Sequence, residues 1–217
     1  AMQALDIRGA GNLLGAEQSG FIADLGYETY QRILKEAVLE LKNEEFSDVL
    51  TADDGSARDD NEFVADCSVE SDMELLLPAD YVPQESERIS LYKELDGIER
   101  ELDLQSFKLR LEDRFGKIPK VTAELLRIPR LRYLARQLGI EKVILKQQSM
   151  YLYFVDETNK AYYQSPMFGR ILNFYQAYPR RCRLREKNGR RSLAINDVPT
   201  VEEAVDILHR ILALKSI

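Results

Sequence analysis

The sequence predicts an α+β fold, in which helices and short strands occupy separate stretches of the chain. Three observations predict it. Several stretches of the chain have apolar residues at helical spacing. Short apolar runs, typical of strands, lie between these stretches. Two of the runs are connected by residues that favour a hairpin turn. We expect a helical hairpin or loop remnant over residues 1–46, an acidic linker over 47–62, and a helix-rich domain with a small, mostly antiparallel sheet over 63–217.

The composition is that of a folded chain, because 45% of the 217 residues are hydrophobic. No run reaches the roughly 18 apolar residues of a membrane span, and the first residues lack the regions of a signal peptide. Cys67 and Cys182 lie far apart and outside any CxxC spacing, which argues against a disulfide scaffold or a cysteine zinc site. We therefore expect a cytoplasmic chain with no membrane partner. Because the chain begins on what resembles the end of a helix, we also expect a piece of a longer protein.

The net charge of −7 is unevenly distributed. Residues 43–72 carry eleven acidic side chains and a single basic one, Arg58. The centre of this stretch, TADDGSARDDNE, has no periodicity and almost no apolar residues, which is typical of a solvated linker. A calcium loop would need DxDxDG-type spacing ending in glutamate, and the stretch does not provide it.

The first elements are predicted from apolar spacing. Residues 27–42 place apolar side chains at i, i+3, i+4, i+7, i+8 and i+11, which predicts a helix. Residues 63–77 predict one or two short strands. Further helices are predicted at 86–95, 104–115 and 121–138. The last of these contains Pro129, where it is expected to tolerate the proline or to kink, and Gly139 caps it.

The remaining elements alternate strands and capped helices. Strands are predicted at 143–145 and 150–155, with 160–163 as a candidate third strand. Ser165 before Pro166 matches an N-cap followed by proline at the first helical position, so a helix is expected to about residue 176. Thr200, followed three residues later by Glu203, predicts a capping box at the start of the last helix.

Residues 180–191 form a basic segment with seven basic side chains and one acidic one. Asn188-Gly189 is a strong signal for a two-residue type I′ hairpin turn. Centring the turn there pairs Cys182 with Ile195 and Leu184 with Leu193 on one face. The arginines that we expect on the other face or near the turn are candidate nucleic-acid contacts: Arg181, Arg183, Arg185 and Arg190. The segment has no interleaved aromatic residue, and the alternative is an exposed sheet face kept soluble by charge.

No pattern in the chain indicates catalysis. His209, the only histidine, lies off the apolar stripe of the last helix and is expected to be exposed there. No P-loop, HExxH or CxxC pattern occurs, so we expect no metal site, no cofactor and no enzymatic activity in this chain. The spacing of three glycines near residue 10 approaches a dinucleotide fingerprint but lacks the preceding strand. The glycines instead predict either a phosphate-touching switch loop, flanked by Arg8 and Gln18, or a plain interhelical turn.

Two stretches carry a family resemblance. ALDIRGAGNLLGAEQSGFIADLGYETYQRILKEAV resembles the TRG motif of the bacterial transcription-repair coupling factors (Mfd) and of the RecG branch-migration helicases. The stretches LLLPADYVPQESERISLYKEL, LEDRFGKIP and LLRIPRLRYLARQLGI resemble the C-terminal domain of the coupling factors, which RecG lacks. The sequence is therefore identified as similar to the C-terminal part of a coupling factor, with a TRG segment at 1–46 and a C-terminal regulatory TRCF domain at 63–217.

The resemblance implies a role within a superfamily 2, ATP-driven translocase on double-stranded DNA that displaces stalled RNA polymerase and recruits nucleotide excision repair. ATP and Mg would bind the motor of the parent protein, upstream of this chain. The residues that would couple hydrolysis to movement on DNA are Arg8, Gly9, Gly11, Gly15, Gln18 and Gly20.

The resemblance also implies that the C-terminal domain is autoinhibitory. It would fold against an N-terminal module similar to UvrB and mask the surface that recruits UvrA. Three alternatives stay open from the sequence: a free-standing nucleic-acid-binding module that uses the basic hairpin, the tail of a RecG-like helicase, and an enzyme with an unrecognised site.

Overall fold

The computed structural model describes Gly26, Arg32, Glu36 and residues 63–214. The TRG residues Arg8, Gly9, Gly11, Gly15, Gln18 and Gly20 and the acidic linker at 47–62 lie outside the described residues. Within the helix predicted at 27–42, Arg32 and Glu36 are described and both are helical. Gly26 forms an isolated antiparallel bridge with Leu76.

The described elements confirm the predicted α+β class. The strands are β1 (Ser68–Ser71), β2 (Ile140–Lys146), β3 (Ser149–Phe154), β4 (Cys182–Lys187) and β5 (Arg190–Asn196). The helices are α4 (Glu85–Asp96), α5 (Glu101–Phe115), α6 (Lys120–Leu125), α7 (Ile128–Gln137), α8 (Lys160–Tyr163), α9 (Pro166–Ala177) and α10 (Val201–Ala213).

The five strands form one sheet in the order β1-β2-β3-β5-β4. β1 pairs with β2 in parallel and the other pairs are antiparallel, so the sheet is mostly antiparallel, as predicted. The β4–β5 hairpin has the predicted register, including Cys182 opposite Ile195 and Leu184 opposite Leu193. Asn188 and Gly189 both adopt positive φ, at 53° and 73°, which is what a type I′ turn requires.

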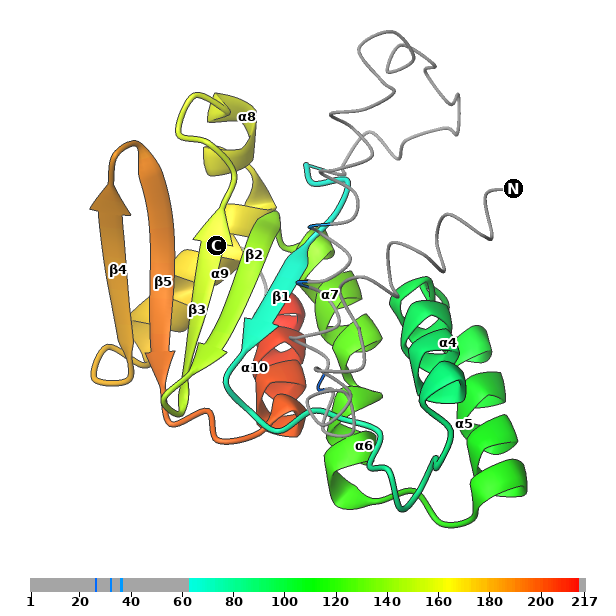
Figure 1. Cartoon of the computed structure of the whole chain (residues 1–217). Coiled ribbons are helices and arrows are strands. Elements are labelled where there is room, and N and C mark those ends of the chain that lie inside the picture. The colour runs from blue at the N-terminus through cyan, green and yellow to red at the C-terminus, as the bar shows by residue number, and fades with distance from the viewer. Residues whose placement is uncertain (1–25, 27–31, 33–35, 37–62, 215–217) are drawn as a thin grey trace, which may run out of the picture.

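The core lies between one face of the sheet and the helices α7, α9 and α10, which Figure 1 shows behind the strands. The side chains of this sheet face alternate with those of the other face along each strand, and they are fully buried. They include Val143, Leu145, Met150, Leu152, Phe154, Leu193 and Ile195. Burial of each side chain of this size contributes about 1.5–3 kcal/mol before conformational entropy is subtracted.

The helices α4 and α5 lie beside this core, next to α7 (Figure 1). They bury Tyr92 and Leu95 from α4 and Phe107 and Leu111 from α5. Two ion pairs, Arg110 with Glu94 and Arg114 with Glu87, join the two helices on their exposed side. Tyr92 also accepts a hydrogen bond through its hydroxyl from the buried amide of Leu77, at 2.7 Å.

The helix predicted at 121–138 is two helices, with a break at residues 126–127. Pro129 has no amide hydrogen, and its ring would clash with the carbonyl of Leu125 in a continuous helix. α6 therefore ends at Leu125, and Pro129 occupies the first turn of α7, where a missing amide costs nothing. Gly139 follows α7 with φ +75°, as expected of a helix cap.

The candidate strand at 160–163 is wrong, because these residues form the short helix α8. The side chain of Asn159 caps this helix by accepting a hydrogen bond from the amide of Tyr162. The helical turn places the ring of Tyr162 in the core, where its hydroxyl donates to the carbonyl of Leu138 at 2.7 Å. Local capping and burial of one aromatic ring therefore outweigh the strand preference of tyrosine.

The predicted N-caps of α9 and α10 are present. The Ser165 hydroxyl accepts a hydrogen bond from the amide of Phe168, and the Thr200 hydroxyl accepts one from the amide of Glu203. The carboxylate of Glu203 lies 3.4 Å from the guanidinium of Arg181. Among the described residues, no helix is both long enough and apolar enough to cross a membrane.

Candidate functional site

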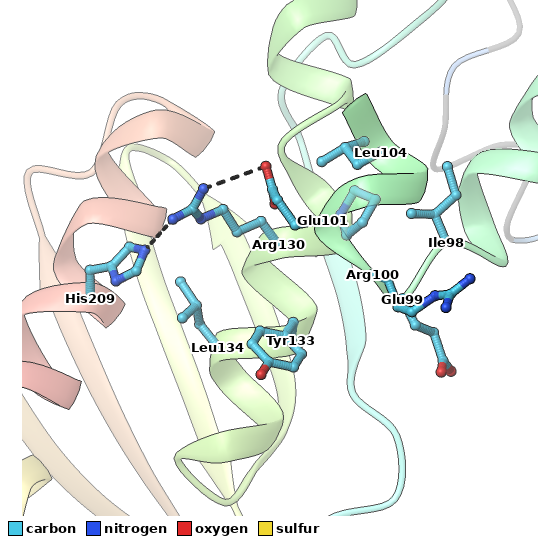
Figure 2. Close-up of a pocket in the computed structure, with 10 residues that line it drawn as sticks. Ile98, Glu99, Arg100, Glu101, Leu104, Arg130, Tyr133, Leu134 and His209 are labelled. Carbon is cyan, nitrogen blue, oxygen red and sulfur yellow. Dashed lines mark hydrogen bonds and ion pairs between the residues drawn. The ribbon is translucent and has the colours of Figure 1, made fainter. Parts of the chain in front are cut away.

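A pocket of about 380 Å³ opens between the start of α5, the middle of α7 and the end of α10. Its floor is apolar and comes from Ile98, Leu104, Pro129 and Leu134. Its rim is polar and comes from Glu99, Arg100, Glu101, Arg130, Tyr133 and His209. Figure 2 shows that these residues come from three parts of the chain: the connection into α5 with the start of that helix, α7, and α10. We call this the α5–α7 pocket.

Arg130 is the central charged group of the rim. Its Nη2 lies 2.8 Å from Nε2 of His209, and its Nη1 lies 3.8 Å from a carboxylate oxygen of Glu101 (Figure 2). A guanidinium can only donate, so Nε2 of His209 is the acceptor in this contact. Arg130 thus links α10 to α5 across the pocket mouth. His209 is exposed on α10, as the sequence predicts.

Two further arginines of α7 hold the connection between α4 and α5 in place. Arg132 donates to a carboxylate oxygen of Asp96 at 2.8 Å, and only 15% of its side chain is exposed. Arg136 lies 3.7 Å from a carboxylate oxygen of Glu99. These contacts fix the segment that supplies Ile98 and Glu99 to the pocket, so the pocket is built on anchored elements.

Large apolar side chains are also exposed on α5, on the side away from its buried stripe, and at the pocket rim on α7. Leu102 and Leu109 on α5 are 79% and 67% exposed, and Tyr133 at the rim is 45% exposed. The two leucines are seven residues apart and therefore lie on the same side of α5. Exposed leucines on one side of a helix are typical of a surface that binds another protein, and an apolar pocket with a charged rim and an exposed tyrosine is a second such feature.

The residues around the α5–α7 pocket do not form a catalytic constellation. Nε2 of His209 already accepts from Arg130, so it is not available as a base. Among the residues that the structure describes, no group of three or more His, Cys, Asp or Glu side chains could hold a metal ion. The Cys67 and Cys182 thiols are buried away from the pocket, and burial raises the pKa of Cys67 to about 12. A thiol with so high a pKa is a poor nucleophile.

Of the four predicted candidate arginines, three are exposed, and two of these have no ion-pair partner among the described residues. Arg183 and Arg185 lie on β4 and are exposed on the sheet face away from the helices. Arg181 instead donates to the carbonyls of Asn196 and Asp197, at 2.8 and 2.7 Å. Arg190 lies 3.9 Å from a carboxylate oxygen of Glu141. The hairpin therefore presents two exposed arginines that are unpaired within the described residues, where the sequence suggested four candidates.

The α5–α7 pocket could not be predicted from the sequence. Its lining comes from residues near positions 100, 130 and 209, and no local pattern shows that these meet in space. One signal was readable. The apolar stripe of α5 passes through Leu104, Phe107 and Leu111, so Leu102 and Leu109 fall off that stripe and should be exposed.

The TRCF domain family model matches residues 71–165. Residues 71–165 belong to the TRCF domain family. The matched segment contains α4 to α8 and supplies every pocket residue except His209. The chain thus carries the domain that its sequence resemblance predicted.

Curated relatives named transcription-repair-coupling factor agree with this match. The chain is similar to the protein of Escherichia coli (strain K12), with 39% identity over 66% of this chain and 12% of that protein. It is similar to the Helicobacter pylori protein with 32% identity over 74% of this chain and 15% of that protein. The similarity to the Rickettsia conorii protein covers 87% of this chain at 27% identity. The chain spans about one eighth of the length of the curated relatives it matches.

A solved structure has the same fold. It is titled "Crystal structure of C-terminal domain of transcription-repair coupling factor". The match has a TM-score of 0.53 and covers 69% of this chain and 95% of the solved one. At 19% sequence identity, this likeness is evidence for the fold alone. The TRCF match favours the coupling-factor resemblance over a RecG-like tail.

Proposed function

We propose that this chain is the C-terminal regulatory part of a coupling factor, and that its TRCF domain restrains the parent protein by docking on another module. The parent would be an ATP-dependent translocase on double-stranded DNA that displaces stalled RNA polymerase and recruits nucleotide excision repair. The exposed leucines of α5 are the observation that carries the docking role, and the α5–α7 pocket adds a second apolar site. The family match supports the context in which that docking would occur.

The chemistry of the surface suits a contact that forms and opens. The apolar floor and exposed Leu102 and Leu109 supply area that gains by being covered. The rim charges Glu99, Arg100 and Glu101 are well solvated and would be only partly desolvated on docking. Interfaces between domains of one chain are of this polar kind when the domains move relative to each other.

We propose the N-terminal UvrB-like module of the parent as the docking partner. While the two are in contact, the surface that recruits UvrA would be covered. Release of the TRCF domain would expose that surface after the motor engages a stalled polymerase. The chain would then act by binding alone, in the cytoplasm, with ATP and Mg bound only by the motor upstream.

The TRG segment supplies the second part of the proposal. Arg8 and Gln18, with the glycines between them, would relay movement of the motor to double-stranded DNA. The bridge between Gly26 and Leu76 brings one residue of this segment against the TRCF domain. Replacing Arg8 or Gln18 by alanine in the complete motor should preserve ATP hydrolysis and abolish displacement of a triplex-forming strand. Normal displacement per ATP hydrolysed would contradict this part.

Calorimetric titration of the chain with the separately produced N-terminal module tests the docking role. The double variant Leu102→Ser/Leu109→Ser should reduce affinity at least about tenfold, because two exposed leucines lose most of the area they would bury, worth about 1.4 kcal/mol or more. Tyr178→Ser, at a 44% exposed tyrosine that does not line the pocket, is the matched control and should bind as the wild type does. Equal affinity of the leucine variant and the wild type would overturn the assignment of this surface.

A further inference from the structure

The sheet has a second face that no described helix covers. Side chains alternate between the two faces along each strand, and the helices α7, α9 and α10 all lie on one side. Figure 1 shows the opposite face of β3, β5 and β4 turned toward the viewer, with no described helix in front of it. We call this second side the open face.

Two tyrosines lie on the open face at its centre. Tyr151 and Tyr153 are two residues apart on β3, the middle strand of the sheet, so both rings point to the same side. Their neighbours Met150, Leu152 and Phe154 are fully buried on the helix side. Both tyrosines are half-buried, as expected for rings that lie along an open sheet surface.

The strand order places arginines beside these tyrosines. Tyr151 is opposite Ala194 on β5, and Ala194 is opposite Arg183 on β4. In the adjacent row the same pattern repeats with Tyr153, Ser192 and Arg185. The residues between each ring and its arginine are small. Two strand spacings, about 10 Å in all, therefore separate an aromatic strip from a basic strip across a shallow trough.

The charged side chains of the open face that have no ion-pair partner among the described residues are basic. Arg183 and Arg185 are exposed, and the described residues give neither an ion-pair partner. Lys146, at the end of β2 on the same face, is also exposed. Lys142 is the exception, because its Nζ lies 3.1 Å from a carboxylate oxygen of Glu70. This basic surface occurs in a chain of net charge −7, so it is a local feature.

We propose that the open face binds single-stranded nucleic acid, with bases stacked on Tyr151 and Tyr153 and phosphates bound by Arg183 and Arg185. Every base has an aromatic face, so two tyrosines about 6.7 Å apart along a strand can each take one base of an extended strand. The guanidinium groups offer planar forks that match phosphate oxygens. The Ser192 hydroxyl lies in the trough, where it can donate to a sugar or a base edge.

The same features disfavour a duplex and a protein as the ligand. Bases in a duplex are already stacked on each other and cannot lie on the tyrosines. A protein partner would need apolar area, and by register the open face of the described strands offers mainly Ile144 beyond its two tyrosines. The basic hairpin itself contains no aromatic residue. The sheet supplies aromatic residues from β3, which is distant in sequence and adjacent in space.

Fluorescence anisotropy of the whole chain with labelled oligothymidine and oligouridine of about 15 nucleotides tests this inference, with a duplex of the same length as reference. The single strands should bind more tightly than the duplex, and binding should weaken between about 50 and 200 mM salt. Tyr151→Leu/Tyr153→Leu should lower the affinity at least about fivefold, since stacking of one base is worth a factor of about five or more. Arg183→Gln/Arg185→Gln should reduce the slope of log affinity against log salt by about 1.4.

Matched controls separate this site from general effects of charge and aromatic content. Lys117→Gln/Arg210→Gln removes the same charge from exposed positions outside the sheet, and Tyr178→Leu replaces an exposed tyrosine at the end of α9. Both should bind as the wild type does, and circular dichroism should show that every variant is folded. Tighter binding of oligouridine than of oligothymidine would identify RNA as the natural ligand. Equal affinities for the two would indicate a site that binds any single strand. Both results would support the proposal.

Four results would overturn it. The first is that neither single strand shows saturable binding at low salt with up to about 100 μM protein, a concentration near the largest dissociation constants of nonspecific nucleic-acid binding. The second is equal binding by the tyrosine variant and the wild type. The third is a duplex that binds more tightly than either single strand. If the open-face variants lost binding to the N-terminal module and kept nucleic-acid binding, the face would be a protein interface and the inference would also fail.

Discussion

Replacing Arg181 by alanine should destabilise the connection between β5 and α10. The Arg181 guanidinium donates to the carbonyls of Asn196 and Asp197 and lies 3.4 Å from a carboxylate oxygen of Glu203, with 23% of its side chain exposed. Asp197 has φ +60°, so the chain turns sharply at the point that Arg181 holds. The side chain therefore ties the start of β4 to the first turn of α10.

The magnitude follows from these contacts. A hydrogen bond to a charged group contributes about 1.5–3 kcal/mol when it is protected from water, and Arg181 makes two to carbonyls. Both lie at the surface, so water can replace part of each, and the partly exposed ion pair adds about 0.2–1 kcal/mol. We expect a loss of about 2–3 kcal/mol, or roughly 5–10 °C in melting temperature for a chain of this size.

Urea unfolding followed by circular dichroism measures this loss, and Arg183 provides the control. Arg183→Ala removes an exposed arginine of the same hairpin that has no ion pair within the described residues, so it should change stability by less than about 0.5 kcal/mol. Arg181→Lys keeps the charge but loses the fork, and should recover less than half of the loss. If Arg181→Ala and Arg183→Ala were equally stable, the proposed structural role of Arg181 would be refuted.

Three further predictions concern the core. Gly139→Ala should cost about 3 kcal/mol in urea unfolding, because φ is +75° and a Cβ would lie 2.1 Å from a ring carbon of Tyr162; wild-type stability would contradict this. Tyr92→Phe should cost about 1–3 kcal/mol, because the buried amide of Leu77 would lose its acceptor, and an unchanged urea midpoint would disprove that role. Burial raises the pKa of Cys67 from 9.0 to about 12 and that of Tyr92 from 10.0 to about 12, so above about pH 9 the unfolded chain holds fewer protons than the folded one. With respect to these two groups, the free energy of unfolding should be constant below about pH 9. It should then fall by about 1.4 kcal/mol per pH unit for Cys67, and above about pH 10 by the same amount again for Tyr92. Cys67→Ala should move the start of the fall to about pH 10, and identical profiles for the variant and the wild type would contradict the assignment.

Local signals in the sequence predicted much of the fold. The Asn188-Gly189 turn predicted the hairpin register, and Ser165 and Thr200 marked the starts of α9 and α10. The errors arose where two local preferences competed. Pro129 opened a new helix where a kink in one long helix was equally consistent with the sequence, and Asn159 capped a helical turn in a segment with strand propensity.

The candidate sites were harder to predict because they depend on strand order and helix packing. The hairpin showed where Arg183 and Arg185 would lie, but only the order β3-β5-β4 brings Tyr151 and Tyr153 near them. The α5–α7 pocket likewise needs α10 to pack on α7, which brings His209 within 2.8 Å of Arg130. Such long-range juxtapositions leave no periodic pattern in the sequence.

Binding of UvrA to the complete coupling factor tests the proposed autoinhibition most directly. We predict that the wild-type protein binds UvrA weakly in the absence of a stalled polymerase, because its TRCF domain covers the recruiting surface. Leu102→Ser/Leu109→Ser in the same protein should release the domain and raise UvrA affinity at least about tenfold, in line with about 1.4 kcal/mol or more of lost docking energy. If this variant and the wild type bound UvrA with the same affinity, the regulatory role proposed for the exposed leucines of α5 would be contradicted.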